Sequence, residues 1–195
     1  FMDASEDLGA DSVNAGTGNN TVLGWGGNDT LIAAGGADSI NAGTGDDRVD
    51  AGSGADTIFG DTGNDSLIGG DGNDSLDGGA DADTLSGGSG SDTIAGGAGN
   101  DSILFGQGLS FSDYALGGEG DDTIYGVEGT QIGGGNPDTL DGGAGNDSLI
   151  TYNSSDSVSG GSDNDTIYDD GGVDTLIGGD GDDSITAAQI SGTAN

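Results

Sequence analysis

The sequence lacks several residue types, and each absence excludes a class of function. Its 195 residues include no cysteine, histidine or lysine, and Arg48 is the only basic side chain. Without cysteine there is no disulfide framework and no thiolate metal site. Without basic side chains, nothing neutralises the phosphates of nucleic acid or of an anionic membrane surface. The chain also has no run of 18 apolar residues, so we expect no membrane insertion.

Acidic residues and glycine are abundant instead. There are 36 acidic residues and 46 glycines, which gives a net charge of −35 at pH 7. Such a composition is typical of disordered chains, but it also favours cations as partners. The order of the residues favours the second interpretation, because the sequence repeats itself.

Aspartate recurs every nine residues, most clearly in the run from Gly69 to Ile103. Each repeat there begins with a pair of glycines, reaches the aspartate at its sixth residue, and continues with a hydroxyl residue and an aliphatic. The series starts at Asp11, and Asn20 takes the place of one aspartate. An aliphatic residue follows two places after every member as far as Asp101. Repeats at a fixed period indicate a solenoid.

The period is interrupted once, in the middle of the chain. Asp101 and Asp113 are twelve residues apart, and Thr130 and Ile132 stand where an aspartate and its core aliphatic are due. We therefore predict a single domain over residues 1–195, with regular repeats at 10–103 and 138–186, an irregular part at 104–137 containing a loop at 104–114, and a tail at 187–195. We favour a loop that covers the apolar surface of its own solenoid over one that contacts a partner.

This period predicts an all-β fold. A nine-residue unit fits a strand of about three residues followed by a six-residue glycine-rich turn, with the aliphatic side chain inside and its neighbours outside. Two units make one coil, and stacked coils make a parallel solenoid of two sheets and about ten turns, ~48 Å long at the usual strand spacing.

Such a solenoid needs a cation to fold. One buried aliphatic contributes about 1.5–3 kcal/mol, whereas ordering nine residues costs about 1–2 kcal/mol each. Stacking also aligns the aspartates, which repel one another. The turns offer carboxylate and carbonyl oxygens, the ligands that calcium prefers. We therefore expect multiple calcium ions between successive turns, and binding free energy then becomes folding free energy.

The repeats GGDGNDSLD, GGSGSDTIA, GGAGNDSLI and GGDGDDSIT resemble the consensus GGxGxDxUx of the repeats-in-toxin (RTX) family, whose nonapeptide binds calcium. The resemblance implies a right-handed parallel β-roll, export by type I secretion, and folding outside the cell. It also implies that the sixth-position aspartates are the calcium ligands. These are Asp11, Asp29, Asp38, Asp47, Asp56, Asp65, Asp74, Asp83, Asp92, Asp101, Asp122, Asp138, Asp147, Asp165, Asp174 and Asp183.

Some turns depart from the consensus. Asn20 is uncharged, Thr130 lacks a carboxylate, and residues 108–112 and 151–155 lack the glycines. We expect missing or altered ions there. The second acids that stand directly before Asp47, Asp122 and Asp183 are interpreted as solvating neighbours rather than ligands.

The sequence favours a non-enzymatic role. Acidic pairs recur in several repeats and there is no histidine, so no position is singled out for catalysis. We expect an extracellular or cell-surface structural module, part of a surface layer, adhesin or filament, that binds calcium and associates with further copies end to end or with other surface proteins. Two alternatives remain: an accessory domain of an exported protease or lipase, and an ice-binding module. Ice binding is less favoured, because Ser and Thr alternate irregularly outside and Thr17, Thr44 and Thr62 form no continuous rank.

Overall fold

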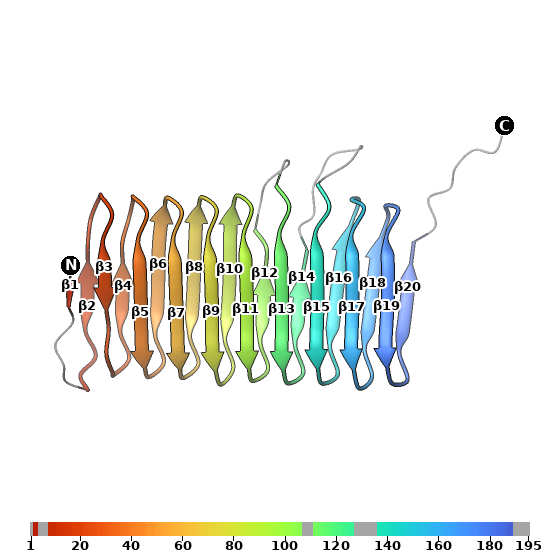
Figure 1. The fold of residues 1–195 in the computed structure, drawn as a ribbon. Coiled ribbons are helices and arrows are strands. Elements are labelled where there is room, and N and C mark those ends of the chain that lie inside the picture. The colour runs from red at the N-terminus through yellow and green to blue at the C-terminus, as the bar shows by residue number, and fades with distance from the viewer. Residues whose placement is uncertain (1, 4–7, 107–110, 127–135, 189–195) are drawn as a thin grey trace.

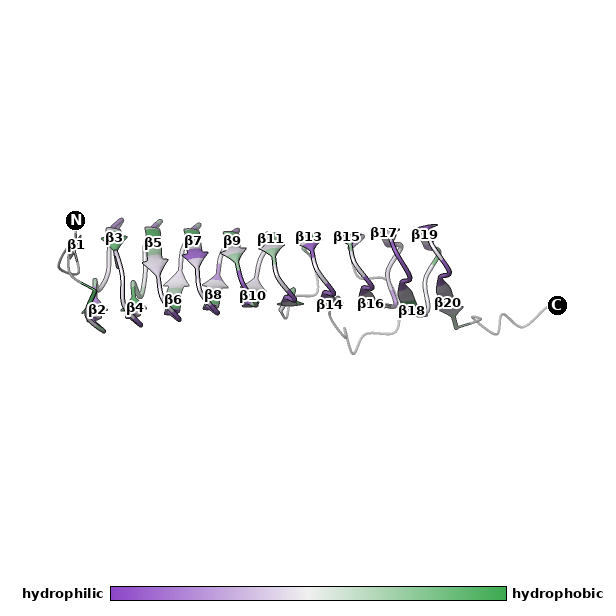
Figure 2. Cartoon of the chain, turned by 90° about the horizontal axis from the view of Figure 1, so that it is seen from below, coloured by the Kyte–Doolittle hydropathy of each residue, from purple (hydrophilic) through white to green (hydrophobic). Residues whose placement is uncertain are grey.

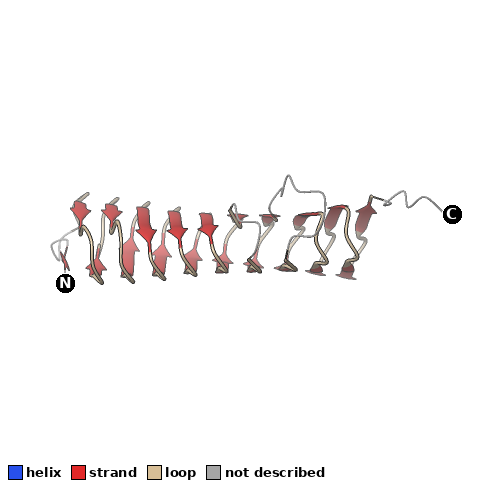
Figure 3. Cartoon of the chain, turned by 90° about the horizontal axis from the view of Figure 1, so that it is seen from above, coloured by secondary structure: helices blue, strands red, loops and turns tan. Residues whose placement is uncertain are grey.

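The chain folds into a straight rod of stacked coils. The computed structural model describes residues 2–3, 8–106, 111–126 and 136–188, and these form strands, bends and turns without a helix (Figures 1 and 3). Within this described part there is therefore no helix that could cross a membrane. The predicted all-β solenoid is confirmed.

Two ten-stranded parallel sheets make up the rod. Odd-numbered strands form one sheet and even-numbered strands the other, and Figure 2 shows the two rows on opposite sides. The odd sheet contains β1 (Met2–Asp3), β3 (Thr21–Leu23), β5 (Ser39–Thr44), β7 (Thr57–Thr62), β9 (Ser75–Ala80), β11 (Thr93–Ala98), β13 (Tyr114–Glu119), β15 (Thr139–Ala144), β17 (Ser157–Ser162) and β19 (Thr175–Asp180). The even sheet contains β2 (Ser12–Asn14), β4 (Thr30–Ile32), β6 (Arg48–Ser53), β8 (Ser66–Asp71), β10 (Thr84–Ser89), β12 (Ser102–Leu104), β14 (Thr123–Tyr125), β16 (Ser148–Tyr152), β18 (Thr166–Asp170) and β20 (Ser184–Ala187).

The register follows the sequence period. In the regular part, paired residues are 18 apart, as for Leu67 and Leu85. The interruption lengthens two successive coils without shifting the register: Ile103 pairs with Ile124, and Ile124 pairs with Leu149. In the other sheet, β13 pairs directly with β15, and their core residues Ala115 and Leu140 remain partners. The predicted repeat at Thr130 and Ile132 lies outside the described residues.

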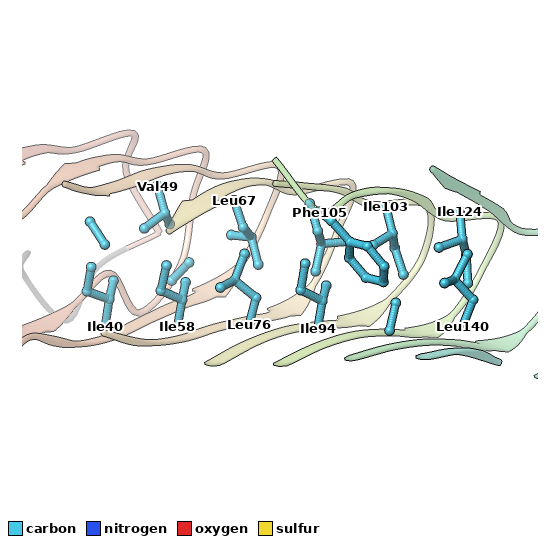
Figure 4. Close-up of a cluster of buried hydrophobic side chains, with 14 of the residues drawn as sticks. Ile40, Val49, Ile58, Leu67, Leu76, Ile94, Ile103, Phe105, Ile124 and Leu140 are labelled. Carbon is cyan, nitrogen blue, oxygen red and sulfur yellow. The ribbon is translucent and has the colours of Figure 1, made fainter. Parts of the chain in front are cut away.

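One aliphatic per strand fills the space between the sheets. These side chains meet in two facing rows along the rod, as Figure 4 shows for Ile58 and Leu67, both fully buried. The neighbours on either side of each aliphatic point outward, as predicted. The residue at the place of the first glycine also faces inward; Ala33, Ala42 and Ala51 are buried there, and so is Phe105. The predicted loop 104–114 is therefore partly core and strand, because Leu104 ends β12 and Tyr114 begins β13.

The strands are longer than the sequence predicted. From β5 to β11 they run for six residues rather than about three, because both residues of the glycine pair continue the strand, whereas β2, β3, β4 and β12 have the predicted three residues. The pairing skips the first glycine, as at Gly69, and resumes at the second, Gly70. Gly70 has φ +113° and Gly72 has φ +150°, and a Cβ on Gly72 would collide with the carbonyl oxygen of Gly54, one coil earlier. The glycine-rich pattern is needed because the coils approach so closely there.

A few turns place another residue at such a positive φ. Ala34, at the site of the second glycine, has φ +75°. The left-handed region costs an L-residue roughly 1–2 kcal/mol, so this position is strained.

We predict that Ala34→Gly stabilises the calcium-loaded roll by about 1 kcal/mol through relief of this strain. Ala95→Gly, within β11 at ordinary strand geometry, is the matched control and should destabilise by about 0.5–1 kcal/mol. Urea unfolding at fixed calcium measures both. Equal shifts for the two variants would contradict the strain argument.

Candidate metal centre along the turn edges

The aspartates of the nine-residue series lie in two columns, one along each edge of the rod. Each stands directly before a strand, so successive members of a column are one coil apart. The first column precedes the even strands and contains Asp11, Asp29, Asp47, Asp65, Asp83, Asp101, Asp122, Asp147, Asp165 and Asp183. The second column precedes the odd strands and contains Asn20, Asp38, Asp56, Asp74, Asp92, Asp113, Asp138, Asp156 and Asp174.

One carboxylate oxygen of each aspartate ties neighbouring coils together. The backbone N–H of Asp65 donates to Oδ1 of Asp83 at 2.7 Å, and the N–H of Asp83 donates to Oδ1 of Asp101 at 2.8 Å. The same bond recurs along both columns, and it survives the long coils, where Asp122 N–H reaches Oδ1 of Asp147 at 2.8 Å. Each aspartate thus satisfies a turn amide one coil earlier.

The other oxygen, Oδ2, is buried and accepts no hydrogen bond within the described part of the chain. The carboxylates are about 2% exposed, so water does not compensate them. A buried charged oxygen without a partner is costly, and an ion or a water is a usual compensation for such an atom in a native fold. The residues concerned are Asp38, Asp47, Asp56, Asp65, Asp74, Asp83, Asp92, Asp101, Asp122, Asp147 and Asp165.

The pKa values of the aspartates in the columns reflect the cost of burying their charge. Burial raises the pKa of Asp65, Asp83 and Asp92 to about 7, against an ordinary value of 3.8. The bonded amide opposes the rise, and the next carboxylates in the column add to it. Burial likewise raises the pKa of Asp122 to about 7 and of Asp147 to about 6. In the described part of the chain, no basic side chain is among the causes of these shifts.

Backbone oxygens converge on the same place. A Cβ built on Gly69 would come within 2.5 Å of Oδ2 of Asp74 and 2.6 Å of the carbonyl oxygen of Gly87. The equivalent point at Gly78 is flanked by Oδ2 of Asp83 and the carbonyl oxygen of Gly96. The first glycine of each pair therefore leaves room for a carboxylate oxygen and a carbonyl oxygen from the next coil.

These donors fit calcium. They are hard oxygens, some carrying charge, and calcium accepts such ligands in flexible geometry. Across the described ranges no three carboxylates are grouped as a metal cluster, so a bound ion takes at most two carboxylates and otherwise uses carbonyl oxygens or water. A calcium ion bound here would supply the positive charge that the buried Oδ2 atoms lack.

Five predicted ligands remain: Asp11, Asp29, Asp138, Asp174 and Asp183. Asp29 is as buried as the residues above, and its Oδ1 accepts the amide of Asp11 in the same way. Asp11, Asp138, Asp174 and Asp183 are only partly buried, at the ends of the columns or beside irregular turns. The pKa of Asp138 is nevertheless raised to about 7, chiefly by burial.

The turns that break the consensus have altered surroundings. Asn20 keeps the backbone bond to Oδ1 of Asp38, but its own side-chain amide donates to the carbonyl of Gly18. In β16 and β18, Thr151 and Asp169 occupy the place of the first glycine, and both are buried. The hydroxyl oxygen of Thr151 has no hydrogen-bond partner there, and burial raises the pKa of Asp169. The turn at residues 151–155, where we predict a missing or altered ion, thus differs from the regular turns in structure. Residues 108–110 and Thr130 lie outside the described residues.

Sequence reasoning missed a second ladder, on the outside of the first column. The residue before each aspartate is mostly Asn or Asp, and its Oδ1 accepts the amide of its counterpart one coil later. Asn64 N–H donates to Oδ1 of Asp46 at 2.9 Å, and Asn146 N–H donates to Oδ1 of Asp121 at 2.8 Å. These bonds lower the pKa of Asp46 and of Asp121. The signal was present, since Asn and Asp recur at that position: Asn28, Asp46, Asn64, Asn100, Asp121, Asn146, Asn164 and Asp182.

Comparison with known proteins agrees with this geometry. The pattern of the RTX calcium-binding nonapeptide repeat matches almost the whole chain, at residues 7–40, 32–67, 50–85, 68–103, 107–130, 132–167 and 168–188. The chain belongs to the RTX family. It is a calcium-binding RTX β-roll, and its aspartate columns are consistent with multiple calcium sites.

A solved structure shares the fold of this RTX roll. It is the crystal structure of a hyperactive, Ca²⁺-dependent, β-helical antifreeze protein from an Antarctic bacterium, with a TM-score of 0.71 and 28% sequence identity. The alignment covers 90% of this chain and 61% of that one, so the RTX roll spans less than two thirds of its neighbour. No curated protein matches the chain.

We predict that Asp83→Asn lowers the number of bound calcium ions by about one, since the amide can keep the Asp65 bond but loses the charge. Asp77→Asn on the same coil, with an exposed side chain, is the matched control and should leave the stoichiometry unchanged. Isothermal titration calorimetry measures both. An unchanged stoichiometry for Asp83→Asn would contradict the assignment.

The raised pKa values predict an unusual pH dependence. In calcium-free protein these carboxyls bind protons more tightly when folded, so stability is present below the unfolded pKa of 3.8 and is lost as pH rises through about 7. Sheet content by circular dichroism should therefore increase on acidification from about pH 8 to about pH 5. Calcium affinity should fall over the same range, because protons compete for the carboxylates. A flat calcium-free profile would contradict the shifts.

Proposed function

We propose that this RTX roll is a calcium-dependent structural module of a secreted or cell-surface protein, and that it folds when it meets extracellular calcium. The observation that supports this proposal is the pair of aspartate columns. Most of their Oδ2 atoms are buried without a hydrogen-bond partner, in a chain of net charge −35. Low calcium leaves these charges uncompensated, so the chain stays unfolded inside the cell. Millimolar calcium outside the cell permits stacking.

The proposed role is structural rather than catalytic. The carboxylates of the columns repeat with the same environment from coil to coil, so none is distinguished as an acid, base or nucleophile. A rigid rod suits a surface layer, adhesin or filament, with further copies or other surface proteins as partners. An accessory role beside an exported enzyme uses the same calcium-dependent folding, and a catalytic motif elsewhere in the parent protein would favour it.

Ice binding is not part of the proposal. The antifreeze function belongs to the neighbour named above, and this chain has no extended threonine rank on its described surface. Thr44 and Thr62 are aligned on successive strands, but the next residue in that rank is Ala80. Two threonines do not form an ordered array of the length of the rod.

We predict that chelation with EGTA abolishes the sheet signal in circular dichroism at pH 7.5 and that excess calcium restores it, since binding free energy supplies folding free energy. Magnesium at equal concentration is the control and should restore little, because it retains its water ligands. Sheet content that is unaffected by EGTA would overturn the proposed switch.

A further inference from the structure

The outer face of the even sheet carries two ordered columns of uncharged side chains. On β12, β14, β16 and β18, the outward residues before and after the buried aliphatic are a hydroxyl residue and a large apolar or aromatic residue. We call this surface the tyrosine face. It consists of Ser102, Thr123, Ser148 and Thr166 in one column and Leu104, Tyr125, Ile150 and Tyr168 in the other.

The apolar column is continuous because its members are direct partners in the sheet. Leu104 pairs with Tyr125, Tyr125 with Ile150, and Ile150 with Tyr168. Leu104, Tyr125 and Tyr168 are 46%, 39% and 41% exposed, so they are accessible although they lie on a flat sheet. Figure 2 places β14, β16 and β18 in one row on the same side of the rod.

The absence of charge on this face is notable in so acidic a chain. Further along the same sheet, β6 has Arg48 and Asp50 at the corresponding outward positions. The odd sheet has Asp77 and Asp141 there. An uncharged strip on a molecule of net charge −35 admits a neutral ligand and repels anionic ones.

The turns that follow these four strands also depart from the repeat. The turns after β12 and β14 are lengthened, since the column spacing there is 21 and then 25 residues. The turns after β16 and β18 replace the first glycine with Thr151 and Asp169. The changes of turn length are thus confined to the edge that follows these even strands, while the turns between β13 and β14 and between β15 and β16 keep the regular length.

We propose that the tyrosine face binds a neutral β-1,4-linked polysaccharide lying along the rod axis. Tyr125 and Tyr168 are two strands apart, ~9.6 Å at the usual strand spacing, close to the length of a disaccharide unit in an extended β-1,4 chain. Each ring can stack on the C–H face of a sugar, with Ile150 contacting the sugar between them. The column of Ser and Thr hydroxyls runs parallel to the rings and can bond the sugar hydroxyls. This inference rests on the roll being folded, not on where the parent protein resides.

A second copy of the chain is the competing occupant. Two tyrosine faces packed together would bring two strongly acidic rods into contact, which charge repulsion opposes. A flat strip two residues wide also buries little area compared with a stable protein interface. We therefore favour the polysaccharide.

Native affinity electrophoresis in calcium tests the proposal, with hydroxyethyl cellulose and glucomannan as separate probes in the gel. We expect retardation of the parent chain and a loss of about tenfold or more in affinity for Tyr125→Ser combined with Tyr168→Ser. Tyr114→Ser is the matched control, because Tyr114 is 42% exposed but belongs to β13 of the opposite sheet. The control should be retarded like the parent. If the double variant does not fold, the single variant Tyr168→Ser replaces it in the same affinity measurement.

Circular dichroism on the same samples separates this proposal from the calcium switch. A folded parent chain that neither neutral probe retards would overturn the polysaccharide assignment while leaving calcium-dependent folding intact. Equal loss for Tyr114→Ser and the double variant would also overturn it. A calcium-dependent dimer in analytical ultracentrifugation, abolished by the double variant, would assign the face to a second copy instead.

Discussion

Carboxylates aligned at the spacing of stacked strands repel one another, and the protein has almost no positive charge to compensate this repulsion. The columns place an aspartate on every coil except at Asn20, and Arg48 is the only basic side chain of the whole chain. The fold cannot avoid this arrangement, because the period that aligns the core aliphatics also aligns the aspartates. The need for an external cation is thus a direct consequence of the repeat.

The two carboxylate oxygens of each aspartate have different surroundings. Oδ1 satisfies a turn amide of the neighbouring coil and holds the turns in register, which any good acceptor could do. Oδ2 is directed to the place left open by the first glycine, where a carbonyl oxygen of the next coil also arrives. Asn20 differs from the aspartates, since it is uncharged and its side-chain amide donates to the carbonyl of Gly18. Oδ1 thus accounts for the backbone bond, and the second oxygen with its charge is available to a cation.

The period of the sequence was sufficient to predict the two sheets, the inward aliphatics and the aspartate columns, because each follows from spacing alone. The length of most strands from β5 onward was predicted too short, since glycine pairs suggest a turn but here continue the strand through a positive φ at residues such as Gly70. Phe105 was assigned to a loop but is core, because only the three-dimensional register shows that its position faces inward. The outer ladder through Asn64 and Asp46 was missed because a polar residue next to a ligand is usually solvated.

The changes of turn length in this rod are confined to one edge. The extra residues of the two lengthened coils all follow the even strands β12 and β14, whereas the turns before the even strands keep one length. The amide-to-carboxylate bonds continue along both edges. The edge with turns of constant length therefore maintains the register of the stacked coils, while the opposite edge accepts insertions of different length. Such a chain can acquire new surface features by mutation without losing the continuity of its scaffold.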